Sequence, residues 1–206
     1  MSAKNPQKPL IIYAHPNSSG STANLAMIKA AQQVENVTIV DLYAKYPDFK
    51  IDIKAEQQLL AAHDILIFQF PLYWYSSPAL LKEWQDVVLQ HGVNYGSKVN
   101  ILTDKMFFCA VTAGVDQQEF LAAGRSLPTI LCPFEQTFQY CKLKILPPFL
   151  LYDAPHDPTT PEIKQHAVLY AELLIALSTQ MLEYAEVQSL ESLNILSLPL
   201  SQKKSL

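Results

Sequence analysis

The chain has 206 residues, of which 50% are hydrophobic, and its formal net charge is −4 at pH 7. This length and apolar content suit one domain with a sizeable core. The acidic balance, without any run of Lys or Arg, argues against nucleic acid as the main partner and favours small molecules or proteins.

The first predicted element is a buried strand over residues 10–13, which is apolar and follows Pro9. His15 comes next, followed by short hydrogen-bonding side chains over residues 17–22, among which Gly20 permits a turn. Residues 23–34 have helical spacing. A helix that begins after such a loop directs free N–H groups at an anion, which predicts a phosphate site. The alternative is an ordinary loop with a Ser or Thr cap.

Strands and helices then alternate along the chain. Such alternation predicts an α/β fold with a parallel sheet, helices on both faces and right-handed crossovers. We expect a connection at 43–53 and a surface excursion at 91–105. The further expected strands are 37–42, 65–70, 106–112 and 142–146, the last stopped by Pro147 and Pro148, and the expected helices are 54–63, 78–89, 119–124 and 127–140.

The C-terminal part is expected to be one long helix followed by a tail. Residues 157–161 open the helix, and its apolar stripe extends the prediction to Glu186. We therefore assign residues 1–186 to the domain and 187–206 to a leucine-rich tail, which either packs back on the domain, joins a dimer contact or stays disordered.

The cysteines and the apolar stretches bear on where the protein works. Cys109, Cys132 and Cys141 are odd in number and lack zinc-site spacing, so we expect reduced thiols in the cytoplasm and no metal. The first residues lack the apolar segment of a secretory signal, and no stretch reaches the roughly 20 apolar residues of a membrane span. We expect neither export nor membrane insertion.

Ligands of open parallel sheets bind at the carboxyl ends of the strands, so three loops are candidates. The first is the hydroxyl-rich loop. The second carries three consecutive aromatic residues at 73–75, which suit a flat ring, although they could instead be core or interface residues. The third, at 112–115, contains Gly114, whose backbone can approach a ring closely, although it could be a simple turn. Together the three loops describe a flavin mononucleotide site.

Several motifs resemble those of the flavodoxin-like NAD(P)H:quinone oxidoreductases. Within these, the chain is most similar to the ancillary flavoproteins of bacterial glutathione-gated potassium-efflux systems, over about residues 10–185. The motifs are YAHP at 13–16, STAN at 21–24, YPDF at 46–49, IDI at 51–53, FPLYWYSSPALLKEW at 70–84, HGVNYG at 91–96 and LPPF at 146–149.

The resemblance implies a three-layer sandwich with a five-stranded parallel sheet ordered 2-1-3-4-5, a homodimer, and bound FMN, with FAD as an alternative. It places His91 and Tyr95 near the flavin ring, unless they simply order their own loop. It also implies three groups of cofactor-binding residues: His15, Ser21, Thr22, Ala23 and Asn24 at the phosphate and ribityl chain; Pro71, Leu72, Tyr73 and Trp74 at the isoalloxazine; and Thr112, Ala113 and Gly114 on its pyrimidine side.

The third loop departs from the family pattern. The family has Thr-Thr-Gly-Gly where this chain has Thr112, Ala113, Gly114 and Val115, and a β-branched Val115 would restrict the backbone and crowd a ring. In the animal enzymes, a Tyr and a His that handle protons follow this loop. Here residues 116–119 are Asp, Gln, Gln and Glu, and we identify no catalytic acid.

The leading hypothesis is a two-step exchange. NAD(P)H gives hydride to the flavin and leaves, and a quinone or other small electrophile then takes the hydride, while N–H groups around 112–114 stabilise developing charge. No Arg or Lys stands out as a reader of the 2′-phosphate. The rival hypothesis is a regulatory subunit with little turnover, which binds a potassium-efflux protein at the inner face of the cell membrane.

Overall fold

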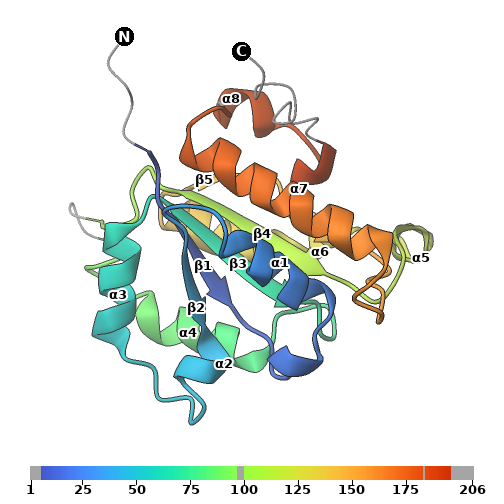
Figure 1. The fold of residues 1–206 in the computed structure, drawn as a ribbon. Coiled ribbons are helices and arrows are strands. Elements are labelled where there is room, and N and C mark those ends of the chain that lie inside the picture. The colour runs from blue at the N-terminus through green and yellow to red at the C-terminus, as the bar shows by residue number, and fades with distance from the viewer. Residues whose placement is uncertain (1–5, 97–99, 183, 196–206) are drawn as a thin grey trace.

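A single parallel sheet forms the centre of the computed structural model, which describes residues 6–96, 100–182 and 184–195 (Figure 1). The strands run in the order β2-β1-β3-β4-β5, and a sixth strand also pairs with β4. This confirms the predicted fold class and strand order. The strands are β1 (Pro9–Tyr13), β2 (Thr38–Asp41), β3 (Ile65–Pro71), β4 (Met106–Thr112), β5 (Lys144–Ile145) and β6 (Phe149–Leu151).

Helices cover both faces of the sheet. Helices α1 and α7 lie together on one face, and α3, α4 and α6 cover the other (Figure 1). The helices are α1 (Ala23–Ala31), α2 (Leu42–Lys45), α3 (Ile53–Ala62), α4 (Ala79–Val88), α5 (Gln117–Ala122), α6 (Leu127–Tyr140), α7 (Pro161–Ser178) and α8 (Tyr184–Val187), with 3₁₀ turns at Ser18–Gly20 and Leu193–Ile195. None of them, within the described ranges, has the length and apolar content of a membrane-spanning segment.

The core explains why the strands read as continuous apolar runs. Successive side chains of a strand point to opposite faces, so Leu10 and Ile12 pack toward Trp84 while Ile11 and Tyr13 pack toward α7. Every residue of β1 and β3 is buried. Because both faces of these strands are buried, their sequences do not alternate between apolar and polar residues.

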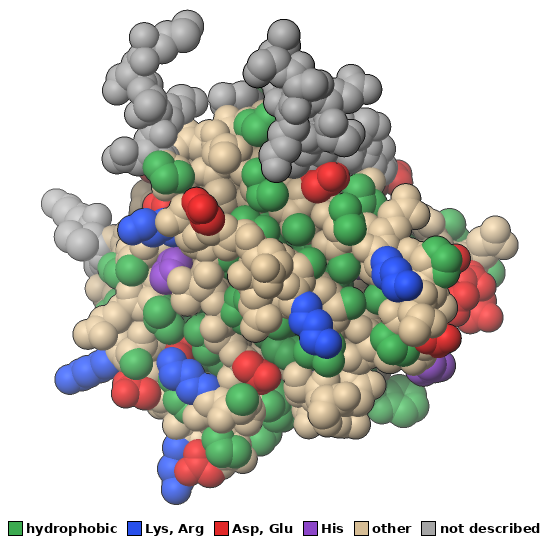
Figure 2. Space-filling model, in the orientation of Figure 1, with side chains coloured by type: hydrophobic (Ala, Val, Ile, Leu, Met, Phe, Trp, Pro, Cys, Tyr) green, Lys and Arg blue, Asp and Glu red, His purple; other side chains and the backbone are tan. Residues whose placement is uncertain are grey.

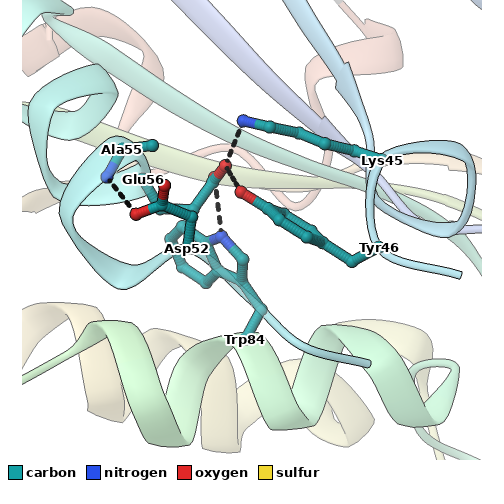
Figure 3. A network of polar contacts seen from close by, with 6 residues as sticks. All are labelled: Lys45, Tyr46, Asp52, Ala55, Glu56 and Trp84. Carbon is teal, nitrogen blue, oxygen red and sulfur yellow. Dashed lines mark hydrogen bonds and ion pairs between the residues drawn. The ribbon is translucent and has the colours of Figure 1, made fainter. Parts of the chain in front are cut away.

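A buried carboxylate ties three helices together on the face covered by α3 and α4 (Figure 3). Glu56 is fully buried, and its Oε1 accepts hydrogen bonds from Lys45 Nζ at 2.6 Å and from the Tyr46 hydroxyl at 2.7 Å. Its Oε2 accepts from Trp84 Nε1 at 2.9 Å. Nearby, Asp52 caps α3 by accepting from Ala55 N. A buried charge is tolerated when it is paired and hydrogen-bonded in this way.

The far edge of the sheet contains a strand that the sequence interpretation missed. Strand β5 pairs Lys144 with Met106, whereas β6 pairs Phe149 with Ala110, so the edge carries one extra residue between them. Pro147 and Pro148 lie at this bulge, where their missing N–H groups cost no ladder bond. The two prolines interrupt the edge strand rather than end it.

The expectation of one helix from residue 157 to Glu186 is wrong, because α7 ends at Ser178. Gln180 has a positive φ of 55°, Met181 N donates to Ala176 O, and Gln180 N donates to Leu177 O. These bonds form a Schellman motif, which usually requires Gly. Without a Gly or Pro at this point, the sequence carries no signal for the stop.

The described part of the tail packs back on the domain. Val187 and Leu193 are buried, and Asn194 pairs with both backbone groups of Leu150, accepting from its N–H at 2.7 Å and donating to its carbonyl at 2.9 Å. This is the first of the three alternatives considered for the tail. Its remainder, 196–206, lies outside the described residues.

Two loop predictions also need correction. The connection at 43–53 begins with the short helix α2, which Asp41 caps by accepting from Ala44 N. The excursion at 91–105 is not all at the surface, because Asn94 and Leu102 are fully buried.

Candidate functional site

The three predicted loops meet at the carboxyl edge of the sheet. The rings of His15 and Tyr73 lie edge to face with their centroids 6.1 Å apart, which joins the first loop to the second. Leu72 N donates to Thr112 O at 2.8 Å, which joins the second to the third. Neighbouring parallel strands end at one edge of a sheet, and these contacts are the consequence.

The first loop leaves the amino end of α1 without a side-chain cap. Thr22 is the N-cap residue, yet its hydroxyl donates to Pro155 O at 2.7 Å instead. In the described part of the chain, no group accepts from the N–H of Ala23, Asn24 or Leu25. These donors and the positive end of the helix dipole suit an anion.

The turn before α1 is held by Asn17, whose Oδ1 accepts from Gly20 N. A Cβ on Gly20 would lie 2.5 Å from Asn17 Nδ2, so a side chain at this position would displace the Asn17 side chain. The Tyr13 hydroxyl, whose pKa is raised by burial, lies 3.1 Å from Ser18 Oγ. These contacts fix the shape of the hydroxyl-rich loop.

His15 is buried, and its surroundings favour the neutral imidazole. Burial lowers the pKa of its imidazole below the ordinary value, against a smaller opposing effect of Asp41. Its Nδ1 accepts from Asn17 N at 3.1 Å, so the neutral ring carries its proton on Nε2. His15 can therefore donate a hydrogen bond without carrying a charge.

A buried amide network underlies the loops. Asn24 Nδ2 donates to Thr112 Oγ1 at 2.8 Å, and Gln69 Nε2 donates to Asn24 O at 3.0 Å. Gln69 is the polar residue of an otherwise apolar strand, and its Oε1 has no hydrogen-bond partner among the described residues. An orphaned buried acceptor is costly and often marks a functional site.

The second loop is a tight and strained turn. Tyr73 N and Ser76 N each donate to the carbonyl of the other residue, and the two residues between them have positive φ, 49° at Trp74 and 61° at Tyr75. This is type I′ geometry, which normally selects Asn and Gly. Bulky residues pay about 1–3 kcal/mol for such a backbone, and the cost is commonly tolerated at binding sites. The turn leaves the Trp74 side chain 95% exposed.

A cavity of about 360 Å³ lies between the second and third loops. A Cβ built on Gly114 would have no atom within 4 Å, so the glycine leaves open space there. The lining residues are Leu72, Trp74, Tyr75, Ala113, Gly114, Val115, Glu119, Phe120, Ala123 and Arg125.

The third loop is not strained by its departure from the family pattern. Val115 does not have a positive φ, and its side chain is 40% exposed. Its β-branched side chain therefore does not strain the backbone of this loop. We expect the N–H groups around 112–114 to be available to a ligand, but the N–H of Ala113 is not available, because it donates to Leu151 O at 2.8 Å. The N–H of Gly114 has no acceptor within the described ranges and is the available donor of this loop.

A family model described as having a flavodoxin-like fold matches residues 7–174. The chain belongs to the flavodoxin-like family. Among curated relatives, this flavodoxin-like chain is 44% identical over 173 residues to the glutathione-regulated potassium-efflux system ancillary protein KefG of Serratia proteamaculans, covering 82% of this chain and 93% of the relative.

Solved structures agree with this assignment. The general stress protein 14 of Treponema denticola, crystallised in complex with FMN, matches with a TM-score of 0.78 and 40% identity over 82% of this chain and 99% of that one. An NADPH-quinone reductase from P. pentosaceus matches with a TM-score of 0.72 and 29% identity, covering 81% and 97%. The resemblance stated from the motifs is thereby confirmed.

The predicted site residues fall into two groups in this fold, those that line the cavity and those that lie near it. Leu72, Trp74, Ala113 and Gly114 line the cavity. The others lie beside or beneath it: Tyr73 in the turn, Pro71 and Thr112 buried at strand ends, and His15, Ser21, Thr22, Ala23 and Asn24 in the first loop and the first turn of α1. The side chains of Ala23 and Asn24 are buried, so the groups that these residues leave available are their backbone N–H groups.

His91 and Tyr95 order their own loop. Their rings lie 5.6 Å apart, Gly92 N donates to Tyr95 O, and a Cβ on Gly96 would fall 2.4 Å from the His91 ring. Tyr95 also contacts Tyr140 of α6.

The sequence interpretation missed several residues of the site. Tyr75, Phe120 and Arg125 line the cavity, and Gln69 donates to Asn24 O in the first turn of α1. Two of them carried a signal: Arg125 is the only arginine in the chain, and Gln69 interrupts an apolar strand. Phe120 carried none, because α5 reaches the cavity only through the fold.

A larger hollow of about 780 Å³ lies on the other side of Phe120, which lines both, between α5, the start of α6, the edge strands and residues 188–194. It contains Glu135, whose pKa is raised by burial. None of the predicted cofactor-binding residues lines it.

Proposed function

We propose that this protein is an FMN-dependent NAD(P)H:quinone oxidoreductase that transfers two electrons as hydride. One observation carries the proposal: the uncapped amino end of α1 and the cavity beside Gly114 are joined at one sheet edge by the His15–Tyr73 contact. The matches to an FMN complex and to an NADPH-quinone reductase support it.

The donor set of the first loop fits the phosphate end of FMN. The N–H groups of Ala23 and Asn24 would bind phosphate oxygens, and the Ser18 and Ser21 hydroxyls lie in the same loop. The Nε2–H of His15 supplies a further neutral donor. The orphaned Gln69 acceptor lies behind this set, beneath Asn24.

The cavity fits the ring end. Leu72 and Trp74 offer apolar surface, and Gly114 offers space together with a free N–H donor. When bound, FMN supplies hydride chemistry that no side chain can perform. The residues of this chain would orient the ring and exclude water from it, and the N–H of Gly114 would be available to stabilise negative charge on it.

The absorbance spectrum of the purified protein tests the cofactor. We expect visible flavin bands, released by heat as FMN rather than FAD. A colourless protein that takes up no added FMN would overturn the proposal.

Ping-pong kinetics test the mechanism. We propose that donor and acceptor use one cavity in turn, because predicted residues of both the second and the third loop, Leu72, Trp74 and Gly114 among them, line the same cavity. Initial rates against NADH at several menadione concentrations should then give parallel double-reciprocal lines. Intersecting lines would contradict a shared cavity.

A second candidate function rests on the 44% identity to KefG. In this role the protein is a regulatory subunit that binds a potassium-efflux protein at the inner face of the membrane, with little turnover. Co-purification with the transporter, and transport activation that survives Trp74→Ala, would favour this role over catalysis.

We further propose that the protein is a cytoplasmic homodimer. The exposed aromatic turn at 73–76 lies next to the cavity and is available to a second subunit. Sedimentation velocity of the protein saturated with FMN tests this state, and a monomer at micromolar concentration would contradict it.

A further inference from the structure

Arg125 is the only arginine of the chain, and it lies on the wall of the cavity beside Gly114. Its backbone is fixed by the end of α5. Gly124 has a φ of 69° and donates to Leu121 O, and Arg125 N donates to Phe120 O at 2.9 Å. This Schellman motif directs the chain back toward the cavity.

The guanidinium of Arg125 is held by an aromatic platform. Its Cζ lies 5.1 Å from the centroid of the Tyr75 ring, a cation–π contact. The Tyr75 ring in turn contacts Phe120 edge to face, with centroids 6.5 Å apart. The strained turn at Trp74 and Tyr75 thus places an aromatic ring beside the guanidinium.

The hydrogen-bonding groups of this guanidinium have no partner among the described residues. In residues 6–96, 100–182 and 184–195, no side chain or carbonyl accepts a hydrogen bond from it, and it forms no ion pair. No lysine lines the cavity, and Glu119 is the other charged residue there. An exposed guanidinium that contacts an aromatic ring and has no other partner in the described part of the chain can bind a carboxylate, sulfonate or phosphate through two parallel N–H groups.

We propose that Arg125 determines substrate specificity by binding an anionic group of the molecule that enters this cavity. The proposal rests on the proposed oxidoreductase function and names the substrate class of that site: a flat redox ring that carries a phosphate or another acidic group. Because Glu119 opposes anions in the same cavity, selectivity depends on Arg125 itself rather than on a general positive field.

The anion can come from the donor or from the acceptor, and matched pairs separate the two. NADH and NADPH are compared with 1-benzyl-1,4-dihydronicotinamide, a donor without phosphate. Naphthoquinone sulfonate is compared with menadione, an acceptor without charge. Arg125→Gln is the test variant, and Lys144→Gln removes one positive charge at the opposite end of the sheet, where β5 begins.

Arg125→Gln should raise KM for the anionic member of at least one pair by roughly ten- to a hundredfold, with little change in kcat, because a charge-assisted hydrogen bond is lost. The neutral member should be unaffected. Raising the ionic strength should weaken anionic substrates in the parent protein more than in Arg125→Gln. Lys144→Gln should behave as the parent.

Equal effects on charged and neutral substrates, or no effect on either anionic member, would overturn the role of Arg125. Calorimetric binding of NADP⁺, which carries the phosphates of NADPH but cannot reduce FMN, and of the sulfonate to the FMN-loaded protein separates this result from failure of the proposed function. If both bind and Arg125→Gln weakens one of them, but no turnover is seen, the oxidoreductase proposal fails and the anion site stands. If the parent binds neither, the anion site fails.

Discussion

The side-chain amide of Asn24 donates a 2.8 Å hydrogen bond to the hydroxyl of Thr112, 88 residues further along the chain. This buried bond joins the first turn of α1, where a phosphate would bind, to the end of β4, where the cavity begins. The two halves of the candidate site are therefore fixed relative to each other by side chains that need not touch a ligand.

Replacing Asn24 with Ala should destabilise the protein by about 1–3 kcal/mol, because Thr112 and Gln69 lose a buried partner. The affinity for FMN should fall as well, since α1 is no longer held against β4. Urea denaturation and FMN titration measure the two effects. Gln33→Ala, at an exposed position after α1, is the control and should change stability by less than about 0.5 kcal/mol. Equal effects of the two substitutions would remove the structural role of Asn24.

The carboxylate of Glu56 should be essential for stability. Glu56→Ala leaves the buried donors of Tyr46 and Trp84, and the partly exposed ammonium of Lys45, without their acceptor, and we expect a loss of about 3–5 kcal/mol. Asp48→Asn, which breaks the exposed pair with Lys50, should cost less than about 1 kcal/mol. Thermal and urea unfolding of both variants provide the comparison, and similar losses would contradict the assignment.

The imidazole of His166 should make the protein less stable in mild acid. It is buried and stacks on Phe149 with centroids 4.3 Å apart, and burial lowers its pKa from the ordinary 6.5 to about 4. Between these values the unfolded chain binds a proton that the folded chain does not, so stability falls as the pH drops from 6.5 toward 4. The full shift corresponds to roughly 3 kcal/mol.

His166→Phe should flatten this part of the pH profile, as measured by urea unfolding at intervals from pH 7 to 4.5. An NMR titration of the parent should show a His166 ring that stays neutral at pH 5.5. A His166 ring that titrates near 6.5 would contradict the burial argument.

The strained turn at Trp74 and Tyr75 should lower the stability of the protein while contributing to substrate binding. Trp74→Asn combined with Tyr75→Gly supplies the residues that type I′ geometry prefers, and we expect a gain of about 1–3 kcal/mol in unfolding free energy. Binding of ring substrates should weaken at the same time. Asn36→Gly relaxes a positive φ of 64° far from the cavity and should leave turnover unchanged. If the double variant keeps full affinity for substrate, the turn has no part in the site.

Local patterns in the sequence were sufficient for the central sheet, because β1, β3 and β4 are buried on both faces and read as continuous apolar runs. They also located the three loops, since the carboxyl ends of parallel strands must meet. What failed depended on distant contacts or on rare backbone conformations. Strand β6 forms only because β4 lies beside it, and α7 stops through a positive φ at Gln180 that no glycine announces.

The cavity shows the same limit at the level of single residues. Leu72, Trp74 and Gly114 lie just after strands β3 and β4, so the sequence pattern predicts them as site residues, and they line the cavity. Arg125 reaches the cavity only because a six-residue helix and a glycine turn carry it back, and its cation–π partner is 50 residues earlier in the chain. The spacing of residues along the sequence therefore could not predict the contact between Arg125 and Tyr75.

The pairing of Asn194 with Leu150 bears on how the protein is made. One amide side chain occupies both the N–H and the carbonyl of an edge residue, as a neighbouring strand would. Figure 2 shows acidic and basic side chains interspersed over one face of the molecule, so charge on that face forms no single-signed field. At Leu150 the edge of the sheet is covered by Asn194, which is synthesised 44 residues later. Until Asn194 has been synthesised, Leu150 of the nascent β6 has unpaired backbone groups, and an open strand edge of this kind favours self-association.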